Sequence, residues 1–283
     1  MSVTGKRMRK NPHGWMLAAV LLLAAAGLLA VHSHQTAAVP PEEPAQEEPS
    51  VTVIPAEPEL PELPEEPVEE DPVPEKPWGP VAESAPVDDS YFDDAVFIGD
   101  SRTVGMYEYG GLEETSTFYA STGLTIYKMF DSKIVAVPGQ KKKITVEEAL
   151  SEKQFAKIYL MIGINEMGTG TVESFMKAYG EAVQHLQQLQ PDAVIYLQAI
   201  MKVTTERSGQ GDYITNEGIE ARNEEIAKLA DDEKIYYLDV NPLICDETKP
   251  SGGMVASYTY DGVHLKARYI PIWLDFLKEH AVE

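Results

Sequence analysis

Short apolar runs alternate with segments of helical periodicity through the second half of the chain, and this alternation restricts the fold more than any other feature. Residues 157–162, for example, form an apolar run that ends at Gly163, and residues 172–189 follow with apolar side chains at helical spacing. Strands separated by helices predict a mainly parallel sheet with helices on both faces. An α/β fold is therefore the expected fold class.

The pattern predicts the following elements. The expected strands cover residues 95–98, 117–120, 134–137, 157–162, 194–200 and 235–240. The expected helices cover residues 102–109, 145–153, 172–189 and 216–229, with a weaker helical pattern after Gly123 up to Phe130 and a final helix that includes Ile270, Trp273, Leu274 and Leu277. Pro271 fits the first turn of the final helix, because a proline ring deeper inside would cost a hydrogen bond.

Basic residues precede an apolar run at the N-terminus. Four of residues 6–10 are Lys or Arg, and an uncharged stretch of 17 residues follows from Trp15 to Val31. This order predicts a cytoplasmic basic tail and a single membrane-crossing signal anchor within residues 1–34, with all later residues outside the cell membrane. A cleaved signal peptide is the alternative, and it would export the same residues. A membrane-anchored protein of the bacterial cell envelope is therefore expected, or a secreted protein if the N-terminal segment is cleaved.

Residues 35–90 have the composition of a disordered linker. They contain 14 of the 20 prolines of the chain and 16 acidic residues, against one basic residue, Lys76. Such a segment cannot bury enough apolar surface to offset its ordering entropy. At about 3 Å per residue, its reach is on the order of 150 Å. We therefore expect a stalk that holds a folded domain, residues 91–283, away from the membrane.

The expected domain is acidic and has a single cysteine. Residues 91–283 carry 30 acidic against 18 basic side chains, a net charge of −12. Nucleic acid is therefore not an expected partner, since its phosphates require clustered Lys and Arg. Cys245 has no second cysteine to join, which excludes an intrachain disulfide and a thiolate metal cluster. Its apolar neighbours predict a buried packing role.

A Gly-Asp-Ser turn follows the first expected strand, at residues 99–101. In open α/β folds, ligands bind where parallel strands end, and Ser101 stands at that position. A serine hydroxyl becomes a nucleophile only when a base removes its proton and hydrogen-bond donors stabilise the resulting oxyanion. The alternative is a turn that only caps the next helix. The remaining residues decide between the two.

One histidine is well placed in the sequence to act as the base. His264 lies in a loop just before the final helix, and loops held by a rigid sheet are where catalytic residues gather. Asp261 stands three residues earlier and can orient the imidazole, as in serine hydrolases generally. An Asp-x-x-His sequence also arises in ordinary turns. The pair is therefore a candidate base with its carboxylate partner.

Two further positions are candidates for oxyanion donors. Asn165 follows the strand at residues 157–162 in a Gly-x-Asn turn, which brings an amide side chain to the same edge of the sheet as Ser101. Gly123 follows the second expected strand, and no side chain of its own obstructs its backbone N–H. The alternative for both is a simple turn or loop residue.

The order of these motifs, Gly-Asp-Ser, Gly, Gly-x-Asn and Asp-x-x-His, resembles that of the SGNH hydrolases, the GDSL-like lipase and acylhydrolase superfamily. The resemblance covers the chain from Tyr91 to its C-terminus, and Gly105 also agrees with it. It implies a flavodoxin-like three-layer α/β/α fold and a serine esterase mechanism that requires no metal or organic cofactor. Carried over by position, it makes Ser101 the nucleophile, His264 the base, Asp261 its partner, and Gly123, Asn165 and the N–H of Ser101 the oxyanion hole.

The chain departs from this pattern at two positions. Arg102 follows the serine where the family name has Leu, and Glu166 follows the asparagine where Asp is frequent. Arg102 is expected either to pair with Asp100 or Glu166, or to hold an anionic or carbonyl group of the substrate.

The leading hypothesis is an exported, membrane-tethered serine esterase. Its substrate would be an ester-bearing small molecule or an acylated glycan of the cell envelope, with a short acyl group such as acetyl. The same site would also serve an O-acyltransferase that passes the acyl group to a sugar hydroxyl. A third alternative is a non-catalytic module that binds the cell wall. Two loops, residues 204–213 and 251–257, are expected to border the substrate site.

Overall fold

A computed structural model of the chain describes residues 80–249 and 252–282. The predicted basic tail and membrane segment, residues 1–34, and the predicted stalk up to residue 79 lie outside the described residues. Within the described part, no helix is both long enough and apolar enough to cross a membrane. The described residues comprise most of the predicted domain and the last part of the predicted stalk, residues 80–90.

A five-stranded parallel sheet forms the centre of the described domain, in agreement with the predicted fold class. The strand order is β2-β1-β3-β4-β5, and every neighbouring pair is parallel. This is the order of flavodoxin-like folds, in which ligands bind at the carboxyl ends of the strands. The strands are β1 (Ala95–Gly99), β2 (Thr117–Ala120), β3 (Lys157–Met161), β4 (Val194–Gln198) and β5 (Ile235–Leu238).

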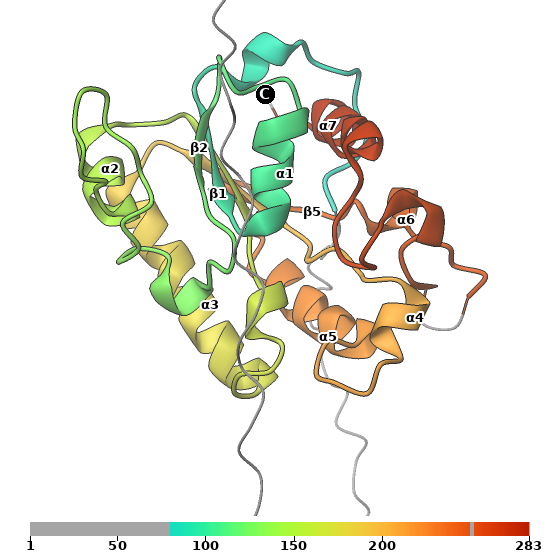
Figure 1. Ribbon diagram of the computed structural model, residues 1–283. Helices are drawn as coiled ribbons and strands as arrows, with labels where there is room; N and C mark the ends of the chain where they lie inside the picture. Colours follow the sequence, from blue (N-terminus) through green and yellow to red (C-terminus); the bar gives the residue numbers. More distant parts are fainter. Residues whose placement is uncertain (1–79, 250–251, 283) are drawn as a thin grey trace, which may run out of the picture. The chain divides into compact units, whose positions relative to one another are not determined.

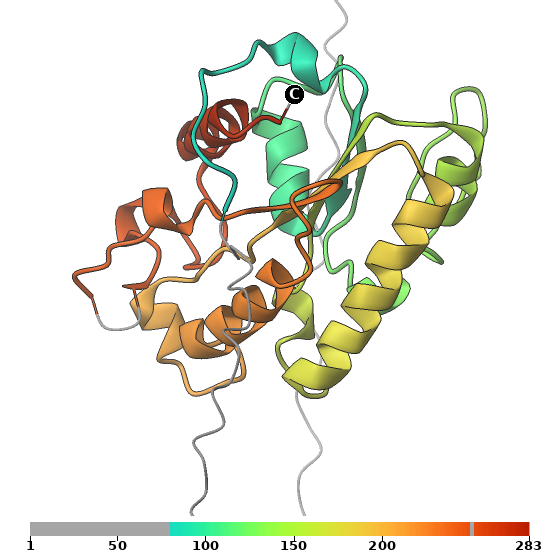
Figure 2. The ribbon, with the colours of Figure 1, turned by 180° about the vertical axis from the view of Figure 1, so that it is seen from behind.

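Helices cover both faces of the sheet and complete three layers (Figures 1 and 2). Successive side chains of a strand point to opposite faces, so Val96 and Ile98 of β1 pack in a first core while Ala95 and Phe97 pack in a second. Helical side chains reach the first core from α2 (Val146–Glu152), α3 (Val172–Leu189) and α5 (Asn216–Ala227). They reach the second core from α1 (Ser101–Tyr109), α6 (Asn241–Ile244) and α7 (Ile270–Glu279).

Short helical turns connect these elements. They are α4 (Thr205–Ser208), η1 (Asp89–Phe92), η2 (Ile126–Lys128), η3 (Ile164–Glu166), η5 (Ala256–Tyr258) and η6 (Ala267–Tyr269). Pro271 lies in the first turn of α7, which confirms its predicted position. The five strands and the longer helices also agree with the prediction, apart from shifts of a few residues at their ends.

The predicted strand at residues 134–137 is wrong. Val135 pairs only with Ile144, through an isolated antiparallel bridge. Both residues belong to the segment between η2 and α2, so the pairing is local. The Val135 side chain is buried in the first core although its backbone does not join the sheet. An apolar side chain can therefore reach the core from a loop, which the sequence pattern does not distinguish from a strand.

The predicted helical pattern up to Phe130 is also wrong for most of its length. Only η2, residues 126–128, is helical there. Leu124 and Ile126 are both buried, and a regular helix cannot place residues two positions apart on one face. The segment therefore forms a loop with a single turn of 3-10 helix.

The chain lies against the domain before the predicted boundary at Tyr91. The N–H of Val81 donates to the carbonyl of Tyr237 in β5 at 3.0 Å, and Val81 packs against the second core. Further along, the N–H groups of Ser84 and Val87 donate to carbonyls at the end of α7, at 2.6 and 3.1 Å. Val81, Ser84 and Val87 thus have backbone partners on the domain.

Gly99, the last residue of β1, lies close to Thr103 of α1 and to the backbone of β3. A Cβ atom here would lie 2.1 Å from Oγ1 of Thr103 and 2.4 Å from the carbonyl oxygen of Met161. Gly99 pairs with Met161 of β3 and with Ala120 of β2, at the carboxyl ends of all three strands. Because only glycine permits this approach, the Gly-Asp-Ser turn leaves the sheet at the level where β2 and β3 also end.

Gly99→Ala is expected to lower the free energy of unfolding by roughly 2–3 kcal/mol, because the new Cβ must displace Thr103 and the β3 backbone. Gly180→Ala is the matched control, since a Cβ at this position of α3 meets no atom within 4 Å. Alanine in a helix should raise stability there by roughly 0.5–1 kcal/mol. Urea denaturation followed by circular dichroism measures both effects, and an undiminished stability of Gly99→Ala would contradict the close approach.

Candidate active site

Ser101 is the first residue of α1, directly after the turn that ends β1. Asp100 caps this helix, since its carboxylate accepts the backbone N–H of Arg102 at 2.9 Å. The N–H of Ser101 stands too early in the helix to have an intrahelical partner, and it lies at the positive end of the helix dipole. The half-buried Ser101 side chain therefore stands beside a donor suited to a developing negative charge.

Ser101, His264 and Asp261 form one chain of hydrogen bonds. Oγ of Ser101 lies 2.8 Å from Nε2 of His264, and Nδ1 of His264 lies 2.7 Å from Oδ2 of Asp261. With its proton on Nδ1, the imidazole can accept the hydroxyl proton of Ser101 at Nε2. The structure thus brings together the three residues that the sequence indicated as nucleophile, base and partner of the base.

Asp261 is held by more than its contact with His264. Its Oδ1 accepts the backbone N–H groups of Val263 and His264, both at 2.9 Å, and the hydroxyl of Thr259 at 3.1 Å. Partial burial acts to raise the pKa of Asp261, but these N–H groups and the His264 ring bring the pKa well below its usual value. Asp261 is therefore ionised at every pH at which a histidine can act as a base.

Asn165 and Gly123 lie in two turns that contact each other. Asn165 belongs to η3, after β3, and its Nδ2 donates to the carbonyl of Leu124 at 2.9 Å. Gly123 has a φ of 76°, and its N–H has no hydrogen-bond acceptor among residues 80–249 and 252–282. No hydrogen bond within the described part joins either residue to Ser101. The second N–H of the Asn165 amide and the N–H of Gly123 thus remain free to meet a ligand.

The buried Arg102 makes neither of the ion pairs predicted for it. Its Nε donates to the carbonyl of Val263 at 3.3 Å, and its Nη1 and Nη2 have no hydrogen-bond partner in the described part of the chain, so the guanidinium is bonded to neither Asp100 nor Glu166. Burial lowers the pKa of Arg102, and the nearby Asp100 opposes this effect. Arg102 is only 4 % exposed. It therefore holds the loop just before His264. Arg102 also lines the small cavity beside Ser101, so its predicted contact with the substrate stays a prediction.

Glu166 is a buried carboxyl group for which the sequence suggested only a pairing with Arg102. It has no exposed surface, its Oε1 accepts the N–H of Ile126, and its Oε2 has no hydrogen-bond partner among the described residues. Burial raises the pKa of Glu166 to about 7, and the nearby Asp100 adds to the increase. Its position directly after the Gly-x-Asn turn was the signal that could have linked it to the site.

Cys245 is partly buried and packs against the second core, in keeping with its predicted packing role. Its Sγ lies 3.7 Å from Oδ1 of Asn241. Burial raises the pKa of the Cys245 thiol to about 12. The thiol is therefore protonated at neutral pH, which is unsuited to a nucleophile.

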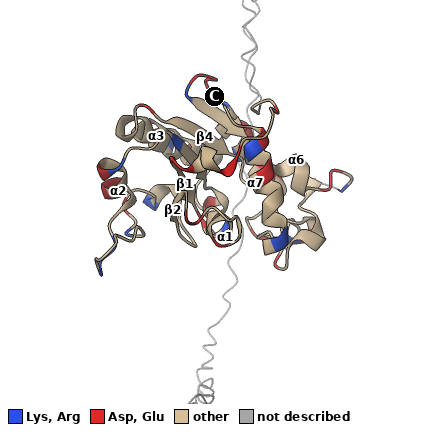
Figure 3. Ribbon diagram, turned by 90° about the horizontal axis from the view of Figure 1, so that it is seen from above, with Lys and Arg blue, Asp and Glu red and all other residues tan. Residues whose placement is uncertain are grey.

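Charged residues are spread over the described part of the chain. Figure 3 shows Lys and Arg scattered along the ribbon and interleaved with Asp and Glu. Within residues 80–249 and 252–282, no three His, Cys, Asp or Glu side chains are arranged to hold a metal ion.

Two cavities border the hydrogen-bonded chain. The cavity beside the nucleophile has a volume of only about 20 Å³, and its lining includes Ser101, Met201, His264 and Trp273. The other cavity, of about 230 Å³, borders Asp261, and its lining residues are Thr204, Glu206, Arg207, Gln210, Ala256, Thr259, Tyr260, Asp261 and Gly262. The first of the two loops expected to border the substrate site thus lines this cavity, together with the residues around the end of the second loop.

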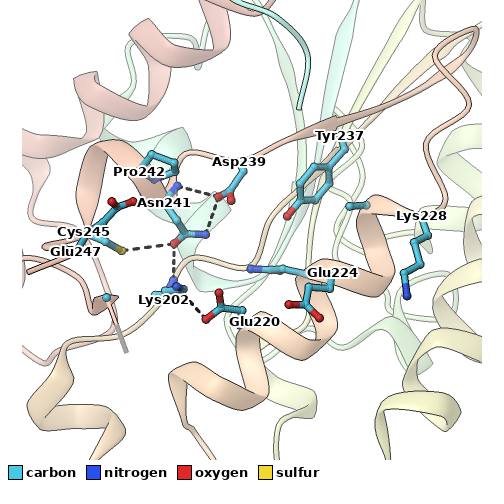
Figure 4. A pocket seen from close by; sticks show the side chains of 13 residues that line it. Lys202, Glu220, Glu224, Lys228, Tyr237, Asp239, Asn241, Pro242, Cys245 and Glu247 are labelled. Atoms are coloured by element: carbon cyan, nitrogen blue, oxygen red, sulfur yellow. Dashed lines mark hydrogen bonds and ion pairs between the residues drawn. The ribbon is translucent and has the colours of Figure 1, made fainter. Parts of the chain in front are cut away.

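A larger cavity, of about 510 Å³, lies at the carboxyl ends of β4 and β5 (Figure 4). Neither Ser101, His264 nor Asp261 lines this cavity. Many of its polar groups bind one another: Lys202 pairs with Glu220 at 3.1 Å, and Nδ2 of Asn241 donates to Asp239 at 2.8 Å. These contacts join the segment after β4 to α5 and the segment after β5 to α6.

The sequence of residues 97–268 matches the GDSL-like lipase/acylhydrolase family, and the matched region includes every predicted site residue. No curated protein matches the chain.

Several solved structures share the fold. A protein from Streptococcus pneumoniae, provisionally named a platelet activating factor, is 22 % identical, and the similarity covers 67 % of this chain and 87 % of that one with a TM-score of 0.50. An acylhydrolase from Bacteroides fragilis, also provisionally named, is 15 % identical over 65 % of this chain and 83 % of its own, with a TM-score of 0.50. At these identities the likeness concerns the fold alone.

Proposed function

The chain belongs to the GDSL-like lipase/acylhydrolase family and is a hydrolase of ester bonds, and from this premise we propose that it is a serine esterase that removes short acyl groups from a glycan. In this proposal Ser101 is the nucleophile, His264 the base and Asp261 the partner of the base. The observation that carries it is the pair of hydrogen bonds, of 2.8 and 2.7 Å, that link these three residues.

Acylation begins when Nε2 of His264 takes the proton of Ser101 and Oγ attacks the ester carbonyl carbon. The former carbonyl oxygen becomes an oxyanion and accepts hydrogen bonds from the N–H groups of Ser101 and Gly123 and from the amide of Asn165. His264 then protonates the leaving alcohol, and the acyl group remains on Ser101. Asp261 stabilises the imidazolium during these transfers without taking its proton.

Water releases the acyl group. His264 removes a proton from the water, the resulting hydroxide attacks the acyl carbon, and the same three donors bind the second oxyanion. Collapse of this intermediate breaks the bond to Ser101, which regains its proton from His264. The acid leaves, and the enzyme returns to its starting state.

Ser101→Ala is expected to lower kcat/KM for p-nitrophenyl acetate by at least about 1000-fold, because His264 loses the hydroxyl that it activates. A fluorophosphonate probe should label the unmodified protein and leave this variant unlabelled. Ser132→Ala is the control, since the Ser132 hydroxyl is exposed and donates only to its neighbour Lys128. Normal turnover and labelling of Ser101→Ala would rule out the proposed nucleophile.

The small cavity beside Ser101 supports a short acyl group. Its volume of about 20 Å³ is close to that needed for one water molecule. The lining residues Met201, Ile270 and Trp273 are buried parts of the second core, so the cavity cannot widen without repacking them. An acetyl group places one methyl group at this position, whereas a fatty acyl chain would need a groove.

We expect kcat/KM for p-nitrophenyl acetate to exceed that for p-nitrophenyl octanoate by at least about 10-fold, because the longer chain gains no enclosed site. The two esters have the same leaving group, so their comparison isolates the acyl side. A preference for octanoate would contradict the short-acyl proposal and favour a lipase.

The alcohol side of the site has features suited to a sugar. The cavity of about 230 Å³ beside Asp261 has a polar lining that includes Arg207, Gln210 and Thr259. Tyr260 borders it with 92 % of its surface exposed, and the ammonium group of Lys266 lies 4.2 Å from the centre of its ring. A ring in contact with solvent beside polar groups resembles the mixed surface on which sugars bind.

The N-terminal sequence adds to this proposal. The basic residues before Trp15, the apolar run and the proline-rich segment support a domain tethered outside the cell membrane, within reach of envelope glycans. Fractionation of cells that produce the full chain would test this location.

Tyr260→Ala should raise KM for an O-acetylated oligosaccharide by about 5-fold, which corresponds to the loss of one aromatic contact of about 1 kcal/mol. Turnover of p-nitrophenyl acetate should not change, because its leaving group does not extend to the cavity beside Asp261. Tyr109→Ala is the control, as Tyr109 is 53 % exposed at the far end of α1. An unchanged KM for the oligosaccharide in Tyr260→Ala would contradict the sugar contact.

A further inference from the structure

A short loop, residues 122–127, carries Gly123 and follows β2 at the carboxyl edge of the sheet. Two residues of η3 hold this loop. The first is Asn165, whose Nδ2 donates to the carbonyl of Leu124 at 2.9 Å. Leu124 is the residue directly after Gly123. One oxyanion donor of the proposed mechanism thus also anchors the loop that supplies another.

The second is Glu166, whose Oε1 accepts the N–H of Ile126. Glu166 has no exposed surface and Ile126 is 4 % exposed, so solvent cannot replace this acceptor. Within the described part of the chain, the contacts from Asn165 and Glu166 are the only hydrogen bonds that join residues 122–127 to another segment. Loss of the Glu166 carboxyl would remove one of two anchors and leave a buried N–H unpaired.

We propose that Glu166 is a positioning residue of the oxyanion hole, which fixes the N–H of Gly123 relative to the amide of Asn165 by holding Ile126. The inference rests on the proposed function, since it concerns the same site. Donors of an oxyanion hole are effective because they are preorganised, and a misplacement of about 1 Å costs on the order of 100-fold in rate. Glu166 touches no reacting atom and acts through the loop.

The Glu166 carboxyl also changes its charge near neutral pH. The charged and titratable groups that act on it are Asp100 at the start of α1 and Arg222 of α5, and it acts in turn on Tyr179 of α3. Burial raises its pKa from 4.5 to about 7, so the native state binds the extra proton between these values. The contribution of Glu166 to stability therefore falls as the pH rises from about 4.5 to 7.

The test compares Glu166→Ala and Glu166→Gln in the purified full chain, with p-nitrophenyl acetate as substrate. Glu166→Ala should lower kcat by roughly 10- to 100-fold and change KM by less than about 3-fold, because the donors stabilise the oxyanion and not the bound ester. Glu166→Gln keeps a carbonyl oxygen for Ile126 and should recover kcat to within about 3-fold. Its urea midpoint should also lose the decrease that titration of Glu166 causes between about pH 5 and 7.

Gln190→Ala is the matched control for loss of a buried polar anchor. Gln190 is 1 % exposed, and its side chain accepts the N–H of Phe155 and donates to the carbonyl of Leu150, at the amino-terminal edge of the sheet. This variant should be less stable but keep kcat within about 2-fold. Equal losses of kcat in Gln190→Ala and Glu166→Ala would overturn the proposal, as would an unchanged kcat in folded Glu166→Ala.

Glu166→Asp replaces Glu166→Ala if the latter does not fold. Its carboxylate is one methylene shorter and cannot hold Ile126 in the same position, so a lower kcat at an unchanged KM supports the proposal and an unchanged kcat overturns it. Ser101→Ala, measured in parallel, separates this inference from the proposed function. Turnover by Ser101→Ala contradicts the esterase itself, whereas an inactive Ser101→Ala beside a fully active Glu166→Ala contradicts only the role of Glu166.

Discussion

The arrangement of the site depends on the close approach of β1 and β3 at their carboxyl ends. Gly99 pairs with Met161, and because Gly99 has no side chain, Thr103 and the Met161 carbonyl occupy the space beside it. β1, β2 and β3 therefore end at one level, and three turns leave the sheet side by side: the start of α1, the loop with Gly123, and η3 with Asn165. A parallel register thus converts residues far apart in sequence into neighbours at one edge, which is where folds of this type bind their ligands.

The same edge contains charged groups whose burial is unfavourable. Asp100, Arg102 and Glu166 are at most 4 % exposed, and atoms of Arg102 and Glu166 lack hydrogen-bond partners in the described residues. A buried polar group without a partner costs roughly 1–3 kcal/mol, so apolar residues here would favour stability. Each of the three adjoins a residue of the proposed mechanism, since Asp100 and Arg102 flank Ser101 and Glu166 follows Asn165. Their contacts fix backbone groups, which suggests that stability is given up here for the geometry of the site.

The sheet was predictable because its strands are compact apolar runs, and the helix at residues 172–189 because a long amphipathic period is hard to mistake. The candidate site could be predicted for a related reason, since its side chains stand in turn motifs directly after strands or before α7. What the sequence could not indicate are contacts with backbone groups. Arg102 contacts the carbonyl of Val263 and Glu166 contacts the N–H of Ile126, and a backbone group has no sequence signal. A local bridge such as that of Val135 is equally invisible, because it depends on how the loop folds back.

The exposure of the hydrogen-bonded residues gives water direct access to the proposed base. The side chains of His264 and Asp261 are 43 % and 54 % exposed, so water reaches the base directly. In a transferase, a bound acceptor must outcompete water for the acyl-enzyme, which a closed site favours. The cavity beside Ser101 encloses little more than a methyl group, and the polar cavity next to Asp261 lies open beside the exposed ring of Tyr260. Water can therefore reach the base that activates it without any movement of the described residues. The open geometry thus fits hydrolysis, the activity of the family, without a closing movement.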